Sequence, residues 1–103
     1  MKVTSLPMAA CRIGDADLPH CSVPFRAQGA IKVLVNFIPW SRMGDLNTPH
    51  LKPCPPECCT HTAPIAVGSK KVFVMGQGAG RVTDKVLGCT AVATGSPNVF
   101  CTI

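Results

Sequence analysis

The sequence contains no tyrosine, and its aromatic side chains are limited to 4 Phe and 1 Trp. Acidic residues are also scarce, with 5 Asp and Glu against 10 Lys and Arg. The longest apolar stretch, residues 30–40, is interrupted by Lys32 and Asn36. A membrane-spanning helix needs about 20 consecutive apolar residues, so a transmembrane helix is not expected. The surplus of basic charge is too small to identify a partner.

Length and composition favour a single small domain. The 103 residues suffice for one core but not for two. With 10 Pro and 9 Gly, long helices are unfavourable, whereas 47% apolar and 15% charged residues are typical of a chain that folds. The apolar segment near the N-terminus is too short for a signal peptide. We therefore expect a chain made in a reducing cytosol, whose 7 cysteines serve as thiols or metal ligands rather than disulfides.

An Arg-x-x-Asp unit occurs three times along the chain. Its copies span residues 12–15, 42–45 and 81–84. Five residues after each Asp stands a side chain that binds zinc in proteins: His20, His50 and Cys89. Self-similarity at a fixed offset indicates a repeat architecture. We interpret each Arg and Asp as an ion pair that fixes a turn, rather than as acid or base catalysts.

A second repeated element predicts strands. Gly29, Gly68 and Gly95 are each followed four residues later by a valine, at Val33, Val72 and Val99. The surrounding β-branched and aromatic runs predict strands over 31–37, 71–75 and 98–103. The expected fold is mainly β, a single domain over 1–103 with pseudo-repeats at about 9–38, 39–77 and 78–103.

The second copy carries an insertion at 50–61, which contains the remaining histidine, His61. Its prolines, Pro53, Pro55 and Pro56, disfavour a helix and a central strand, so we expect a loop. A closed set of four ligands forms a structural zinc site. The residues therefore predict one structural Zn²⁺ held by His20, His50, His61 and Cys89.

The other cysteines have less defined roles. Cys54, Cys58 and Cys59 cluster in the insertion, where they are packed thiols, additional metal ligands or an oxidised pair. Cys11, Cys21 and Cys101 are expected at small buried apolar positions, which is the common fate of an intracellular cysteine.

Enzymatic activity is not expected, because no cysteine or serine nucleophile has a histidine left to act as its base. The glycine-rich segment 76–80 lacks the Lys and Ser or Thr of a phosphate-binding loop, and is interpreted as a turn. Basic residues stand at Lys70, Lys71, Arg81 and Lys85. Phe73 is the one aromatic residue among them and no recognised nucleic-acid-binding module is present, so no nucleic-acid surface is predicted.

Three segments carry a resemblance to a known family. Residues 9–15, 39–45 and 95–100 resemble the PAAR-repeat proteins, and the similarity runs from Ala9 to Ile103. No copy spells Pro-Ala-Ala-Arg, and the third has Thr83 where the other two have glycine.

The resemblance implies a small conical β-fold that caps a homotrimeric β-helical spike, with one chain per trimer. Such proteins sharpen the spike of a contractile phage tail or of a type VI secretion system for piercing a cell envelope. The implied metal ligands near the apex are again His20, His50, His61 and Cys89. The strands around Val33, Val72 and Val99 would continue the β-structure of the spike.

The implied location is the spike tip of a virion baseplate, which we favour, or the bacterial cytoplasm before delivery by type VI secretion. The target membrane is a transient partner, and a secreted effector is a further one. Because the chain ends at Ile103, no fused effector domain is expected. Two other classes remain open: a zinc-binding nucleic-acid or regulatory module built on 54–61, and a secreted toxin stabilised by disulfides.

Overall fold

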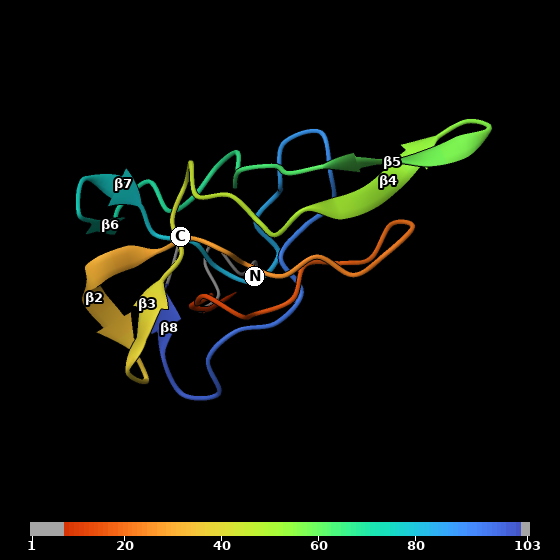
Figure 1. Cartoon of the computed structure of the whole chain (residues 1–103). Helices are drawn as coiled ribbons and strands as arrows, with labels where there is room; N and C mark the ends of the chain where they lie inside the picture. The colour runs from red at the N-terminus through yellow and green to blue at the C-terminus, as the bar shows by residue number, and fades with distance from the viewer. Residues whose placement is uncertain (1–7, 102–103) are drawn as a thin grey trace, which may run out of the picture.

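The computed structural model describes residues 8–101, which form a mainly β-structure of short strands (Figure 1). The strands are β1 (Met8–Ala9), β2 (Ala30–Val35), β3 (Ile38–Trp40), β4 (His50–Cys54), β5 (Glu57–His61), β6 (Phe73–Val74), β7 (Gln77–Gly78) and β8 (Phe100–Cys101). Within 8–101 there is no helix, and hence none long and apolar enough to cross a membrane. The predicted mainly β fold is confirmed.

The strands pair as four two-stranded antiparallel sheets. Three are local hairpins, β2–β3, β4–β5 and β6–β7, whereas β1 and β8 come from opposite ends of the described chain. The strand predicted over 31–37 ends at Val35, because Asn36 and Phe37 adopt positive φ angles in the hairpin turn. The strand predicted over 71–75 is reduced to β6. Of the strand predicted over 98–103, Thr102 and Ile103 lie outside the described residues.

The three Arg-x-x-Asp units share one geometry. In each unit one Asp oxygen accepts the backbone N–H and the Nε–H of the Arg three residues earlier, while the other accepts from Nη2. Gly14 and Gly44 have φ angles of 91° and 90°, and Thr83 takes the same left-handed region at 80°. The predicted turn-fixing ion pairs are confirmed, and the third turn keeps the same left-handed conformation with Thr83 where the other two have glycine.

The residues before these units form a closed ring of backbone hydrogen bonds. Cys11 donates to the carbonyl of Gly80, Gly80 donates to Ser41, and Ser41 donates back to Cys11. The N···O distances are 3.2, 3.0 and 2.9 Å. A Cβ atom on Gly80 would lie 2.4 Å from the Ser41 carbonyl oxygen, so only glycine fits there. The ring relates the three copies by an approximate threefold axis.

Two small apolar clusters of buried residues form the core of the described chain. One contains Cys11, Ala63, Ile65, Val86 and Val92, and the other contains Ala30, Val74, Ala79 and Cys101. The second cluster joins β2, β6 and β8, and Figure 1 shows these strands gathered at one end of the molecule. We call this end the base. The buried positions predicted for Cys11 and Cys101 are confirmed, and burial raises the pKa of the Cys11 thiol.

The insertion at 50–61 is a β-hairpin, so the predicted loop is wrong. We call β4–β5 the apical hairpin, because it projects from the end opposite the base (Figure 1). Its strands pair in register from His50 with His61 to Cys54 with Glu57. The prolines disfavour a helix and a central strand, but they do not exclude an edge strand. Both strands of a two-stranded sheet are edge strands, so β4 tolerates Pro53. Pro55 and Pro56 occupy the turn.

Four cysteines form two disulfides, Cys21–Cys58 and Cys54–Cys59. The expectation of thiols in place of disulfides is therefore wrong for these residues. Cys21, predicted at a buried packing position, is exposed and bonded to the apical hairpin. For Cys54 and Cys59 the structure matches the oxidised-pair alternative.

Candidate metal centre

Four side chains converge beside the apical hairpin: His20, His50, His61 and Cys89. Their ligand atoms all lie within 4.8 Å of one another. A tetrahedral zinc ion with bonds of about 2.0–2.3 Å places its ligand atoms roughly 3.3–3.6 Å apart, which this cluster accommodates. The structure thus brings together all four residues that the sequence predicted. We refer to them as the metal centre.

Each repeat contributes to the centre through the segment that follows its Arg-Asp turn. His20 lies in the segment 18–23 of the first copy, and Cys89 in the tight turn where its backbone N–H donates to Val86. His50 opens β4 and His61 closes β5. Because these two histidines are cross-strand partners, the hairpin itself delivers His61, with the two ring centroids 4.3 Å apart.

The ring nitrogens are oriented for binding through Nε2. The Nε2 atoms of His20 and His50 lie 2.6 and 3.1 Å from Cys89 Sγ. The Nδ1 of His50 lies 2.8 Å from the carbonyl oxygen of Thr48. Since a carbonyl only accepts, Nδ1 carries the proton and leaves the Nε2 lone pair available. A hydrogen bond to the second ring nitrogen is typical of metal-binding histidines.

His61 supplies an independent test of fit. Its Nε2 is buried and has no hydrogen-bond partner among the described residues. A buried polar atom without a partner is costly unless a ligand satisfies it. Burial lowers the pKa of His20 and His61, and the neighbouring His50 and Lys52 lower it further. Both rings therefore favour the neutral form that binds metal, and the residues fit a metal ion.

A buried polar group lies behind Cys89. The Asn47 side chain donates from Nδ2 to Asp17 Oδ2 at 3.0 Å and to Cys89 Sγ at 3.9 Å, and its Oδ1 accepts from the Ala63 backbone. Asp17 also pairs with Arg26 at 2.8 Å, with both side chains inaccessible to solvent. Interactions of this kind orient metal ligands.

Sequence reasoning missed this group, although the repeat spacing contained a signal for it. The residue two positions after each repeat Asp is Asp17, Asn47 or Val86, and all three are buried. The same offset argument that identified the ligands would have identified these positions.

The base carries a second candidate surface. Val33 and Val72, predicted to contact a spike, are half-buried and pack against the cluster under the base, and Val99 is also half-buried. The residue that follows each valine is exposed: Leu34, Phe73 and Phe100 are 51%, 63% and 54% exposed. Val33 and Leu34 both lie in β2, where successive side chains point to opposite faces, whereas Val72 and Val99 directly precede β6 and β8.

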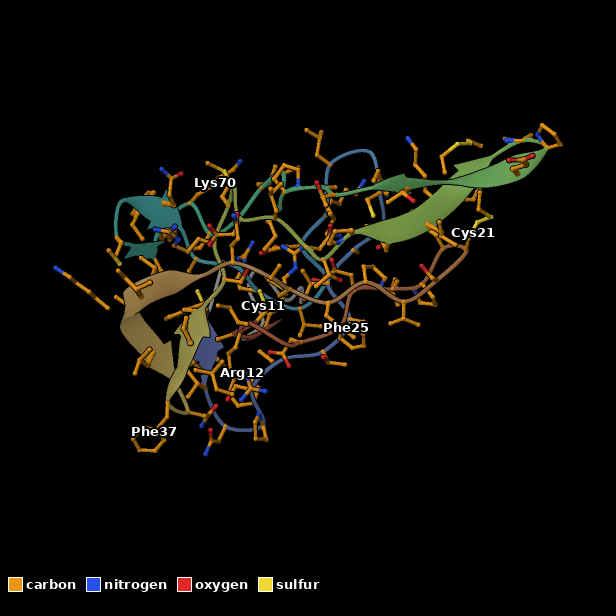
Figure 2. The ribbon with its side chains drawn as sticks, in the orientation of Figure 1. Cys11, Arg12, Cys21, Phe25, Phe37 and Lys70 are labelled. Atoms are coloured by element: carbon orange, nitrogen blue, oxygen red, sulfur yellow. A yellow bond between two sulfur atoms is a disulfide. The ribbon has the colours of Figure 1, made fainter. Side chains whose placement is uncertain are left out.

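Figure 2 shows the two ends of the molecule. Phe37 projects from the β2–β3 turn at the base, and Cys21 lies beside the apical hairpin at the other end. Phe37 is 94% exposed. The metal centre lies at the root of the apical hairpin, where His50 pairs with His61, and the apolar base is a separate feature.

The metal centre is a closed set of three imidazoles and one thiolate. Such a set satisfies the four positions of a tetrahedral ion and suits a structural role. A scan against protein-family models finds no match, and a search of curated proteins finds no significantly similar sequence.

Proposed function

We propose that this chain is a non-enzymatic spike-tip protein that caps a homotrimeric β-helical spike and holds a structural zinc ion near its tip. The observation that carries the proposal is the ring of backbone hydrogen bonds among Cys11, Ser41 and Gly80. A single chain with approximate threefold symmetry can contact three identical subunits through three similar surfaces.

The apolar base supports this partner. Leu34, Phe73 and Phe100 occupy corresponding positions in the three copies, five residues after the repeat glycines. All three are exposed, and Phe37 adds a fourth apolar side chain at the same end. Exposed apolar groups repeated about an approximate threefold axis suit a trimer better than an asymmetric partner. The strands around Val33, Val72 and Val99 would then extend the β-structure of the spike.

The metal centre supports a mechanical role for the opposite end. Three imidazoles and one thiolate suit zinc, which has no redox chemistry and prefers tetrahedral nitrogen and sulfur ligands. The ion would join the segments of all three repeats at one point, where the small apolar clusters provide little stabilisation of their own. This end would lead as the machine pierces the target envelope, a phage tail being our first choice and type VI secretion the second.

The base is tested by binding to a candidate homotrimeric β-helical spike. Substituting Phe73→Glu and Phe100→Glu together removes two apolar contacts and places charge at the interface. Burial of each phenylalanine contributes about 1.5–3 kcal/mol, so affinity should fall at least roughly tenfold. Leu87→Glu is the matched control, because Leu87 is 62% exposed but lies in the turn beside Cys89. Equal binding by both variants would refute the assignment of the base.

A further inference from the structure

The Cys21–Cys58 disulfide lies at the edge of the metal centre. Cys21 directly follows His20, and Cys58 lies in β5, three residues before His61. The bond therefore connects the segment that carries one ligand to the hairpin that carries two others. The two cysteines are separated by 37 residues, so the bond joins parts of the chain that are distant in sequence.

Besides the disulfide, the His20 ring contacts the rings of His50 and His61, with centroids 5.4 and 5.5 Å apart, and two hydrogen bonds connect the segments. The backbone N–H of Cys21 donates to the carbonyl of Leu51 at 3.3 Å, and the Leu51 N–H donates to Ser22 Oγ at 2.9 Å. Both hydrogen bonds lie at an exposed edge, and Leu18 and Val23, which flank them in the same segment, are each 49% exposed. The ends of the segment are anchored, because the Asp17 N–H donates to the carbonyl of the buried Pro24 and the Leu18 N–H donates to Ala91. No residue of 18–23 belongs to the described apolar clusters, so the disulfide is the one covalent restraint described between the middle of this segment and the apical hairpin.

We propose that the Cys21–Cys58 disulfide positions His20 and makes metal retention by the centre dependent on the redox state of the chain. This inference rests on the metal site of the proposed function. With the bond intact, His20 is held beside His50 and Cys89 before metal arrives, which lowers the entropy lost on binding. With the bond broken, His50, His61 and Cys89 keep their positions, whereas His20 lies on a segment that is no longer bonded to the hairpin and has more conformations available.

The redox step is a two-electron thiol–disulfide exchange. Two thiol groups of a low-molecular-weight reductant supply two electrons and two protons, and they leave as the disulfide of that reductant. The bond between the Sγ atoms of Cys21 and Cys58 breaks, and each sulfur becomes a thiol. The reverse exchange with an oxidised thiol compound restores the bond.

The second disulfide provides a matched control within the same hairpin. Cys54 and Cys59 are separated by only 5 residues, and both lie in the apical hairpin. Because Cys58 and Cys59 are adjacent in β5, their side chains point to opposite faces, so this bond does not touch the segment of His20. Its removal changes the number of disulfides by the same amount without releasing a ligand.

The experiment compares two double variants, Cys21→Ser with Cys58→Ser and Cys54→Ser with Cys59→Ser, against the parent chain. Zinc affinity is measured by competition with a chromophoric chelator, and the visible spectrum of the cobalt-loaded chain reports the number of ligands. We expect the first variant to lose about tenfold to hundredfold in affinity, as for loss of groups that orient metal ligands, and to show a weakened tetrahedral cobalt spectrum. The second variant should stay within about threefold of the parent.

A second measurement covers the case in which the first variant does not fold. The parent is titrated with a thiol reductant, and zinc release to the chelator is followed while alkylation and mass spectrometry identify the broken bond. Release that tracks reduction of Cys21–Cys58 supports the proposal. Equal affinities of the two variants, tighter binding after reduction, or release that tracks Cys54–Cys59 overturns it. A parent chain that binds no metal refutes the metal centre itself, whereas a metal-binding parent with equal variants refutes only this inference.

Discussion

The buried ion pair between Asp17 and Arg26 offers a sharp test of the energetics of the core. Both side chains are inaccessible to solvent, and the Nη2 to Oδ2 distance is 2.8 Å. Arg26 also donates from Nη1 to the carbonyl of Asp45 at 3.1 Å. In the third repeat the corresponding positions hold Val86 and Val92, so the same fold accommodates an apolar pair there.

Substituting Arg26→Met leaves the Asp17 carboxylate buried without its counter-ion. Breaking a buried pair in this way typically costs about 3–5 kcal/mol, which for a domain of this size corresponds to roughly 15–30 °C in melting temperature. The double variant Asp17→Val with Arg26→Met replaces both charges with apolar groups, as in the third repeat. It should recover all but about 1–3 kcal/mol, the residual cost of leaving Asn47 and the Asp45 carbonyl with fewer partners.

The assay is chemical denaturation of the zinc-loaded, disulfide-bonded chain, with metal and redox conditions held constant. The expected coupling between the two substitutions exceeds about 1 kcal/mol. A single Arg26→Met variant that loses less than about 1 kcal/mol, or a double variant no more stable than the single one, would show that the pair is not buried as described.

Three further outcomes are expected. Cys89→Ser should lower the melting temperature of the zinc-loaded chain by roughly 25 °C or more, measured by calorimetry, because it removes a metal ligand. Cys101→Ser, a buried polar replacement that costs about 1–3 kcal/mol, should lower it by only roughly 5–15 °C, and equal effects would contradict the role of Cys89. Gly80→Ala should reduce the yield of folded protein, measured by circular dichroism, because the added Cβ would lie 2.4 Å from the Ser41 carbonyl oxygen. A variant as stable as the parent would argue against the ring of backbone hydrogen bonds among Cys11, Ser41 and Gly80. The metal-free chain should be most stable above about pH 7 and should lose stability as the pH falls below about 6.5. The folded-state pKa values of His20 and His61 are lowered, so the unfolded chain binds more protons than the folded chain in this range. Melting curves at several pH values test this, and a melting temperature that does not change between about pH 5 and 7 would contradict it.

Three of the four metal ligands were predictable because they follow from the repeat spacing. Each ligand segment starts at an Arg-Asp turn of fixed geometry, so an equal offset in sequence becomes an equivalent position in space. His20, His50 and Cys89 share that offset, and His61 was assigned as the remaining histidine. His61 reaches the metal centre because it pairs with His50 across the apical hairpin. The sequence did not predict this pairing, because the prolines of the insertion favoured a loop.

The disulfides were not predictable by the same logic. Thiols were expected from the lack of a recognisable signal peptide, which is an inference about the compartment and not about geometry. Whether Cys21 meets Cys58 depends on how the segment 18–23 lies against β5, and no repeat offset encodes this contact. The exposed side chains of the base were not predictable from the repeat valines alone. The valines marked the repeat, but Val33 and Val72 pack against the buried cluster, and the residues that follow the three valines, Leu34, Phe73 and Phe100, are exposed.

In the proposed function, one chain with a metal-bound tip caps one homotrimeric spike. Native mass spectrometry of the chain mixed with a candidate β-helical spike tests it most directly, because one spectrum reports both protein stoichiometry and bound metal. We expect a complex of one chain, one zinc ion and three spike subunits. A complex with three copies of this chain per trimer, or a folded chain that carries no metal and forms no complex, would contradict it.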